Sequence, residues 1–265
     1  MAVLLERRVS AEARWSRRIA YFAAVLLVTS VAGHRFGAVE TIALFWLFGV
    51  VVGLALVALL LSAVGFLRLW EFGDKGGRNS VKGLLAALVV LAPFGFGVAQ
   101  FFLSPRLTDI STDLVDPPRF HHARAQRPAQ ANPIRPVAAA QAIVQIDYYP
   151  EITGRRYPLA MATARSISDA VVEQLGWTML GPIRMGAFGG VMTLEVMAPS
   201  PWIGIVSDAA IRLTDEGETT YLDIRSVSRF GNHDLGDNAA KINRFLAAFE
   251  DEIAARNALF PAPAE

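Results

Sequence analysis

The sequence predicts an α+β protein in which three transmembrane helices precede a domain with an antiparallel sheet of about four strands and two covering helices. Three observations support this fold class. Long charge-free apolar runs fill the first hundred residues, charges and prolines become frequent after Leu103, and strand-like and helix-like patterns alternate beyond that point. The chain has 265 residues, of which 53% are hydrophobic, and a mean hydropathy of +0.37. These values favour a membrane protein over a soluble one.

Residues 1–103 form the predicted membrane domain, with helices at about 19–33, 41–67 and 81–103. A bilayer core about 30 Å thick requires about 20 apolar residues in a helix. The second and third segments meet this length, the third with only Lys82 at its start. The first segment is shorter, and Ser30-Val31-Ala32 also has the small-x-small form of a signal-peptide cleavage site. A long polar stretch precedes this segment, which favours a retained helix over a cleaved signal.

The distribution of Lys and Arg predicts the orientation, because short cytoplasmic loops carry an excess of positive charge. The loop between the first two helices has only Arg35. The N-terminal tail and the second loop are much more basic and contain Arg7, Arg8, Arg14, Arg17, Arg18, Arg68, Lys75, Arg78 and Lys82. We therefore expect a cytoplasmic N-terminus and a periplasmic C-terminal domain on a bacterial cytoplasmic (inner) membrane.

Composition excludes several kinds of function. The chain has no cysteine, which excludes disulfides, thiolate catalysis and cysteine-bound metals. Residues 104–265 carry fifteen Lys and Arg against nineteen Asp and Glu, a balance that argues against nucleic acid as a partner. No Asp, Glu, Lys or His lies in the middle of a predicted span, so an ion pathway is not expected. The motif from Gly49 to Gly53 permits close helix approach, but one G-x-x-x-G is weak evidence.

Residues 104–158 are rich in proline and are predicted to be a mostly irregular linker. This stretch contains His121-His122, a possible pair of metal ligands. Adjacent residues in extended chain point in opposite directions, and no further histidine is close in sequence. We therefore expect neither a metal site nor a cofactor.

Residues 159–257 form the predicted soluble domain. Apolar residues at helical spacing predict a helix over 159–175 that Gly176 ends. Four strands are expected at 177–183, 191–197, 202–213 and 219–227, with a hairpin turn at 214–217 between the last two. A final helix is capped by the acidic run 234–237 and carries one apolar face. An antiparallel sheet covered by two helices accounts for this order of elements.

One segment resembles a known family. The run from Leu222 to Asn238, followed by Lys241-Ile242-Asn243-Arg244-Phe245, is similar to the signature of a bacterial and plastid family called domain of unknown function 1499, D-x-R-S-x-S-R-x-G-x-x-D-x-G-x-N. Residues 116–120 and 149–152 also resemble it, so the likeness covers about 109–250. Ser207-Asp208 stands where the family often has paired acids, and Lys241 replaces a frequent arginine. The resemblance implies family membership and no established reaction.

The signature run also supplies the candidate site. Asp223, Arg225 and Val227 alternate with Ile224, Ser226 and Ser228, so the two sets fall on opposite faces of a strand. The arginines suit carboxylate or phosphate groups, and a helix N-terminus binds anions readily. The candidate residues are Arg225, Ser226, Ser228, Arg229, Asp234 and Asn238. They predict either a site for an anion or lipid headgroup, or a structural corner. In the corner, which we favour, Asp234 caps the helix, Asn238 bonds the turn, and the arginines pair with Asp223, Asp234 or Asp237.

The sequence favours a membrane-anchored binding or interaction module over an enzyme. The expected partners are the lipid bilayer and either an envelope protein or an anionic small molecule. One alternative is an envelope hydrolase that uses Ser226 and His233, which are residue types of a hydrolytic triad but lack a nucleophile-elbow motif. The other alternative is an accessory subunit of a membrane transport complex.

Overall fold

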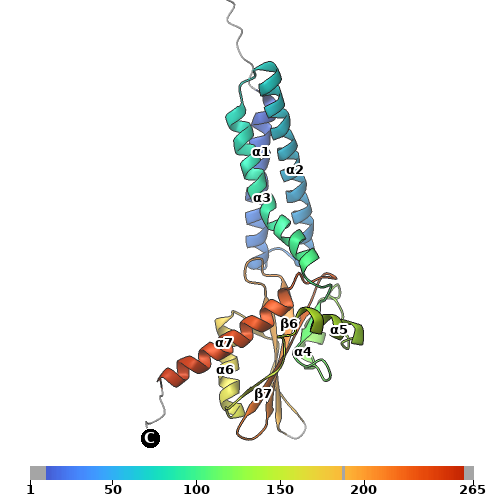
Figure 1. Ribbon diagram of the computed structural model, residues 1–265, viewed down its shortest axis with the longest axis vertical. Helices are drawn as coiled ribbons and strands as arrows, with labels where there is room; N and C mark the ends of the chain where they lie inside the picture. The colour runs from blue at the N-terminus through green and yellow to red at the C-terminus, as the bar shows by residue number, and fades with distance from the viewer. Residues whose placement is uncertain (1–9, 187–188, 260–265) are drawn as a thin grey trace, which may run out of the picture. The chain divides into compact units, whose positions relative to one another are not determined.

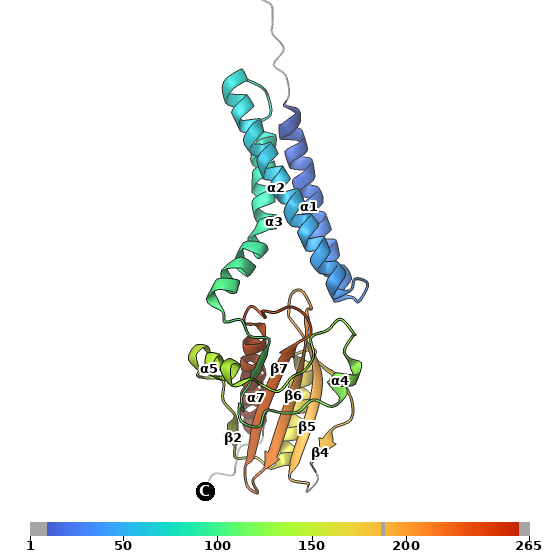
Figure 2. The same ribbon diagram turned by 90° about the vertical axis from the view of Figure 1, so that its right-hand side faces the viewer.

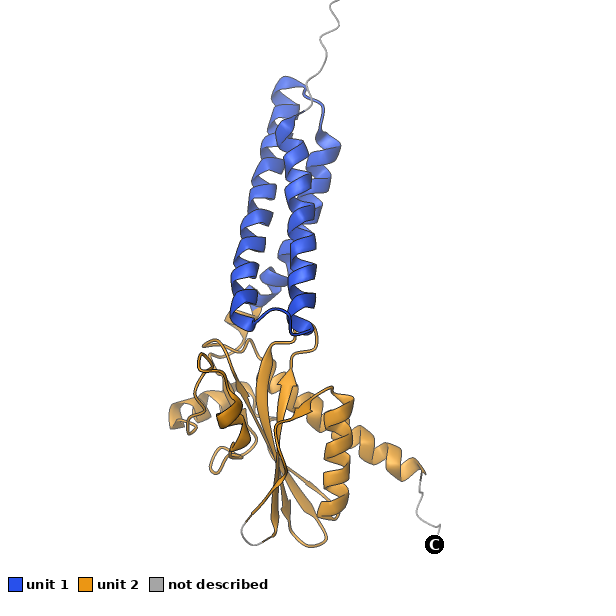
Figure 3. Ribbon diagram, turned by 180° about the vertical axis from the view of Figure 1, so that it is seen from behind, with its two compact units in different colours: residues 1–99 blue, residues 100–265 orange. Residues whose placement is uncertain are grey.

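The computed structural model describes residues 10–186 and 189–259, so Arg7 and Arg8 lie outside the described residues. The chain divides into two compact units, residues 1–99 and 100–265 (Figure 3).

Three helices make up the first unit, as predicted (Figure 1). They are α1 (Ala11–Arg35), α2 (Thr41–Phe72) and α3 (Gly77–Leu103), and each is long and apolar enough to cross a membrane. Helix α1 begins eight residues before the predicted start because Ser10 caps it: the Ser10 side chain accepts a hydrogen bond from the Ala13 backbone N–H at 3.1 Å. Hydropathy locates only the apolar part of a helix, whereas the cap determines where the helix starts.

Small residues line the contacts among the three helices. The buried small residues are Ala13, Ser16, Ala20, Ala23 and Ser30 on α1, Ala55, Ala58, Ser62 and Gly65 on α2, and Ser80, Gly83 and Ala87 on α3; Leu44, Val51 and Val90 are buried as well. Two serines also bond across helices, since Ser16 Oγ donates to the Ala58 carbonyl at 2.9 Å and Ser62 Oγ to that of Ser80 at 2.7 Å. Close approach and interhelical hydrogen bonds are the forces that hold helices together in lipid. By contrast, Gly49 and Gly53 make no close contact within the described part of the chain.

The second unit is an α+β domain built on an antiparallel sheet in the order β1-β7-β6-β5-β3, with β2 beside β7 and β4 beside β5 (Figure 2). The seven strands are β1 (Asp109–Ser111), β2 (Arg155–Tyr157), β3 (Thr178–Met179), β4 (Arg184–Met185), β5 (Val191–Pro199), β6 (Val206–Asp215) and β7 (Thr220–Ser228). The predicted fold class is confirmed, and so is the hairpin turn between β6 and β7, where Gly217 has φ +91°.

Two predicted strands differ in extent from the structure. The strand expected over 177–183 is reduced to two residues, because Pro182 has no N–H to donate and Gly181 packs closely against His122. The strand expected over 202–213 begins at Val206, because residues 200–205 form a turn closed by the Ser200 N–H to Ile205 carbonyl bond of 2.8 Å.

Residues 104–158 are mostly irregular, as predicted, but they are part of the sheet domain and not a linker. Strands β1 and β2 both pair with β7, and two helices, α4 (His122–Gln126) and α5 (Ala139–Tyr148), lie between them in the sequence. Leu107, Ile110 and Ile152 are buried in the main core of the domain. Strands of three residues are too short to show a periodic pattern, so the prolines, which indicate irregular chain, are the clearest local signal in this stretch.

The two faces of the sheet are covered differently. Helices α6 (Met161–Gln174) and α7 (Asp237–Leu259) pack on one face over an apolar core that includes Ile211, Ile224 and Phe245. Residues 112–137, here called the strap, cross the other face, where Phe120 and Ala123 pack on Ala210 and Val227. In Figure 1, α6 and α7 lie on one side of the sheet and α4, within the strap, on the other.

Candidate functional site

Strand β7 distributes the predicted site residues between the two faces of the sheet. Ser226 and Ser228 point to the helix-covered face with Ile224, and Arg225 points to the strap face with Asp223 and Val227. Ser226 and Ser228 bond to Asn238 on α7, and Arg225 bonds to the Pro118 carbonyl in the strap. The predicted alternation is therefore confirmed. The same alternation prevents the serines and the arginines from meeting in one site.

On the helix-covered face, Asn238 joins β7 to the start of α7. Ser226 Oγ donates to Asn238 Oδ1 at 2.8 Å, and Asn238 Nδ2 donates to Ser228 Oγ at 2.8 Å and to the Thr108 carbonyl at 3.1 Å. Asp234 accepts the backbone N–H groups of Gly236 at 2.9 Å and Asn238 at 3.1 Å. Burial raises the pKa of the Asp234 carboxyl. Asn238 is completely buried, so these hydrogen bonds link β7 to the start of α7 away from solvent.

Ser226 and His233 have separate partners. The Ser226 hydroxyl is completely buried and donates to Asn238. The His233 ring is bonded by one nitrogen to the Leu235 N–H at 2.9 Å, while the other lies 3.1 Å from the Phe101 carbonyl. Ser226 and His233 are therefore not paired as nucleophile and base, which the hydrolase alternative requires.

On the strap face, the two signature arginines pair with carboxylates that the sequence did not indicate. Arg229 Nη2 lies 2.6 Å from Asp208 Oδ1, and Arg225 Nη2 lies 2.6 Å from Asp109 Oδ2. Asp208 also accepts from Arg127 Nε at 2.6 Å, so two guanidinium groups share one buried carboxylate. The expected pairing with Asp223, Asp234 or Asp237 is wrong, because the partners lie on the strands beside β7, where Asp109 and Asp208 both face Val227 in the sheet register.

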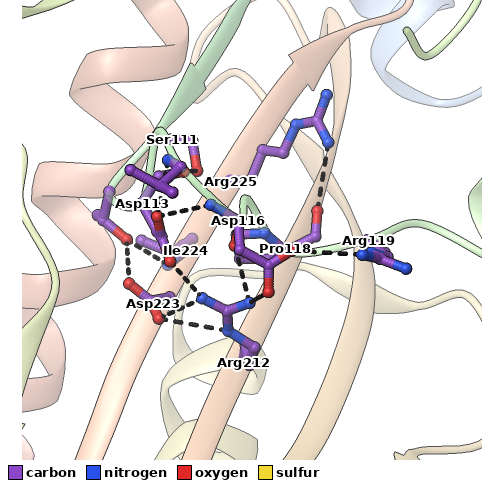
Figure 4. Close-up of polar contacts among 11 residues, drawn as sticks. Ser111, Asp113, Asp116, Pro118, Arg119, Arg212, Asp223, Ile224 and Arg225 are labelled. Carbon is purple, nitrogen blue, oxygen red and sulfur yellow. Dashed lines mark hydrogen bonds and ion pairs between the residues drawn. The ribbon is translucent and has the colours of Figure 1, made fainter. Parts of the chain in front are cut away.

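Further charges fasten the strap to the sheet, as Figure 4 shows for its first part. Arg212 lies 2.8 Å from both Asp113 and Asp223 and 3.1 Å from Asp116. Arg225 Nη1 donates to the Pro118 carbonyl at 3.3 Å. Buried charges are costly unless they are paired and hydrogen-bonded, so this network fixes the path of the strap.

Glu195 on β5 holds the next part of the strap. Its carboxylate accepts the backbone N–H of His121 at 2.8 Å and that of Ala123 at 2.9 Å, at the start of α4. Glu195 and Asp208 were not predicted as site residues, although a charge at an inward position of an apolar strand is a recognisable signal. Arg127 and Asp109 gave no such signal, because both lie in the stretch that was interpreted as a linker.

Strap residues and Arg225 line an arginine-rich cavity of about 660 Å³ that is open to solvent, here called the strap cleft. Its apolar walls come from Leu114, Val115, Pro117, Phe120, Pro136 and Val137. Its basic lining comes from Arg119, Arg124, Arg135 and Arg225 together with His121, and of the lining residues only Asp116 is acidic. A smaller cavity of about 290 Å³ shares Asp116, Arg119 and His121 with the cleft and adds Arg184 and Arg212.

The exposed arginines of the two cavities are not neutralised by the protein. Among the described residues, Arg124, Arg135 and Arg184 have no carboxylate within ion-pair distance, and Arg119 has only the exposed Asp116 at 3.4 Å. The pKa of His121 is lowered from 6.5, first by desolvation and then by the positive charge of Arg184. The strap cleft therefore presents excess positive charge to solvent, which attracts anions.

The two adjacent histidines point to different surroundings. His121 lines both cavities, whereas the His122 ring packs on Gly181, at which an added Cβ would come within 2.7 Å of the ring. In the described part of the chain, no group of three or more His, Asp or Glu side chains is arranged to hold a metal ion.

The structure defines a class of protein in which an α+β sheet domain with a charge-fastened strap follows three apolar helices. A family model described as "protein of unknown function (DUF1499)" matches residues 109–249, and the chain belongs to this family. The matched region begins at β1 and ends in α7, so it contains all seven strands and the whole strap. The family resemblance of the signature run is thus confirmed. No match to the chain was found among curated proteins or among solved structures.

Proposed function

We propose that this protein is a membrane-anchored binding module whose sheet domain binds an anionic ligand in the strap cleft, on the periplasmic side of a bacterial inner membrane. The observation that supports this best is the strap cleft itself: about 660 Å³, lined by four arginines and one acidic residue. This proposal relocates the anion site that the sequence suggested, from the start of the last helix to the opposite face of the sheet.

The chemistry of the cleft suits a small anion with an apolar part. Guanidinium groups bind carboxylate and phosphate through paired, charge-assisted hydrogen bonds. Arg225 is already committed to Asp109, Pro118 and Arg135, so we assign it the role of supporting the cleft. Arg119, Arg124 and Arg135 are exposed and are the groups that would contact the ligand. Proline, valine and phenylalanine walls suit the apolar part, as in most ligand pockets.

The anchoring role rests on the three helices. Their mutual hydrogen bonds involve Ser16, Arg17, Ser62, Ser80 and Asn79 and concentrate toward the end where α1 and α3 begin and α2 finishes. Among the described residues, the interior beyond these contacts is formed by Ala, Val, Leu, Ile and Phe side chains, with Ser30 as one buried polar residue. Such a bundle offers no polar route through its middle, so we favour an anchor over a transport subunit. Because α1 takes part in these contacts, we also propose that it is retained, with the basic N-terminal end of the bundle in the cytoplasm.

Replacing Arg124 or Arg135 by alanine is expected to weaken anion binding roughly tenfold each, since a hydrogen bond to a charged group contributes about 1.5–3 kcal/mol. Binding of inorganic phosphate and of glycerol phosphate to the full-length protein in nanodiscs, measured by titration calorimetry, tests this. Arg165→Ala is the matched control, because Arg165 is an exposed arginine on α6, outside the cleft, that pairs with Asp169.

The outcomes separate the possible sources of the anion. Binding of both soluble probes that only the cleft variants lose supports a soluble ligand. Probe binding in neutral nanodiscs that is lost when the nanodisc contains an anionic phospholipid supports a lipid headgroup, which then competes with the probe for the cleft. If no probe binds, or if Arg165→Ala weakens binding as much as the cleft variants do, the proposal is overturned.

Anion affinity is expected to rise as the pH falls, because of His121. The lowered pKa of this side chain keeps the ring neutral at pH 7 in the empty cleft. A bound anion stabilises the protonated ring and raises its pKa, so binding takes up a proton between the two pKa values. Sulfate is a suitable probe, since its own charge is constant in this range. It should bind more tightly at about pH 5.5 than at about pH 7.5 in the wild type, and equally at both in His121→Asn. The same pH response in both proteins would contradict a role for His121.

A further inference from the structure

The last residues of α3, which belong to the second unit, contact the sheet domain. The Phe101 ring lies 4.8 Å from the His233 ring, and the Arg106 guanidinium lies 5.1 Å above the Phe101 ring. Pro105 and Leu107, the second and fourth residues after α3, are already buried. Phe101, near the end of α3, therefore lies against the turn of residues 233–236.

Two other turns of the domain meet at the same end of the sheet. The turn of residues 200–205 joins β5 to β6 where Ser207 faces Ser228, the last residue of β7. Lys241 on the second turn of α7 connects these segments, since its Nζ lies 2.9 Å from Ser207 Oγ and 2.6 Å from Asp237. The 233–236 turn leads directly into α7. The end of α3, the 200–205 turn and the 233–236 turn thus surround one end of the domain.

This end exposes large apolar side chains on all three segments. Phe102 and Leu103 at the end of α3 are 79% and 71% exposed, Trp202 is 88% exposed, and Leu235 is 41% exposed. Leu235 also has a positive φ of 55°, which is unusual for a leucine. The opposite end of the sheet carries the β6–β7 hairpin, whose tip is formed by Asp215, Glu216, Gly217 and Glu218. Single exposed apolar residues are ordinary, but a group on adjoining segments indicates an interaction surface.

We propose that Trp202 and Leu235 insert into the interfacial layer of the bilayer that α3 enters, so that the sheet domain is a membrane-contacting domain and not one held away on a stalk. The occupant is the lipid surface, because residues 101–103, which adjoin the exposed group, are the last residues of a helix apolar enough to span the membrane. Tryptophan is enriched at this depth, where its ring is buried among acyl chains and its N–H stays near water. Arg106 supplies a cation for lipid phosphates at the same level.

The test uses the absence of cysteine in the chain, because any introduced cysteine becomes the only labelling site. Trp202→Cys and Leu235→Cys, each carrying a nitroxide, are reconstituted as full-length protein in liposomes of phosphatidylcholine with phosphatidylglycerol. Glu218→Cys, at the acidic hairpin, is the matched control. Electron paramagnetic resonance then compares the accessibility of each nitroxide to oxygen, which concentrates in lipid, and to a water-soluble nickel chelate.

We expect the ratio of oxygen to nickel accessibility at positions 202 and 235 to be several-fold higher than at position 218. Equal ratios at 202, 235 and 218 would overturn the proposal. Positions 202 and 235 are tested in separate variants, so a folding defect in one leaves the other informative. Unchanged oxygen and nickel accessibility after addition of a soluble anion would show that this result does not depend on ligand binding in the strap cleft.

Discussion

Asp208→Asn is expected to lower the free energy of unfolding of the sheet domain by about 3–5 kcal/mol, the usual cost of leaving a buried charge without its partner. The Asp208 side chain is completely buried and is shared by Arg229 and Arg127. Asparagine preserves the shape but removes the charge that compensates two guanidinium groups. Arg127 also donates to the Val227 and Asn132 carbonyls, so the loss should loosen the strap as well as the sheet.

Hydrogen exchange of the β6 and β7 amides in the full-length protein measures this loss, since exchange of central strands reports global opening. Asp169→Asn is the matched control, because Asp169 forms an exposed pair with Arg165 on α6 and should give no measurable change. A small effect of Asp208→Asn, equal to that of the control, would show that the buried network contributes little to stability.

Asn238→Ala is expected to cost on the order of 3 kcal/mol, because it removes several buried hydrogen bonds at once. The substitution leaves the Ser226 hydroxyl, the Ser228 hydroxyl and the Thr108 carbonyl without this partner. Asn238→Asp retains an acceptor for Ser226 but loses both donors, and it places a second carboxylate next to Asp234. We therefore expect the aspartate variant to be no more stable than the alanine variant.

Asn243→Ala provides the control for this prediction. It is the same substitution on the same helix, at an exposed position, and alanine favours the helix slightly. Thermal unfolding of the full-length variants in one detergent gives the comparison. Equal stabilities of the position-238 and position-243 variants would mean that the connection between β7 and α7 is energetically unimportant.

In the structure, the polar residues of the family signature bond to other groups of the domain. Asp223 binds Arg212 and Thr112, Arg225 binds Asp109, and Arg229 binds Asp208. The two serines bind Asn238. In the proposed function, the groups that contact the ligand are supplied by the strap, and the signature residues hold the strap in position.

Local patterns in the sequence determined much of the architecture. The three apolar helices, the hairpin between β6 and β7, the amphipathic last helix and the alternation of β7 all depend on residues close together in the chain, and each is present in the structure. Hydropathy, turn chemistry and side-chain periodicity are properties of short windows, so they can be recognised without knowledge of the fold.

The tertiary structure alone decided which residues meet. Arg225 binds Asp109 across 116 positions of sequence, and Arg127 binds Asp208 across 81. Strands β1 and β2 have three residues each and are stabilised by pairing with β7, so nothing in their own sequence distinguishes them from a linker. The strap cleft exists only because this stretch is held against the sheet by charges from three other strands. Long-range pairing of this kind depends on the sheet register, which brings distant residues side by side and leaves no trace in local sequence.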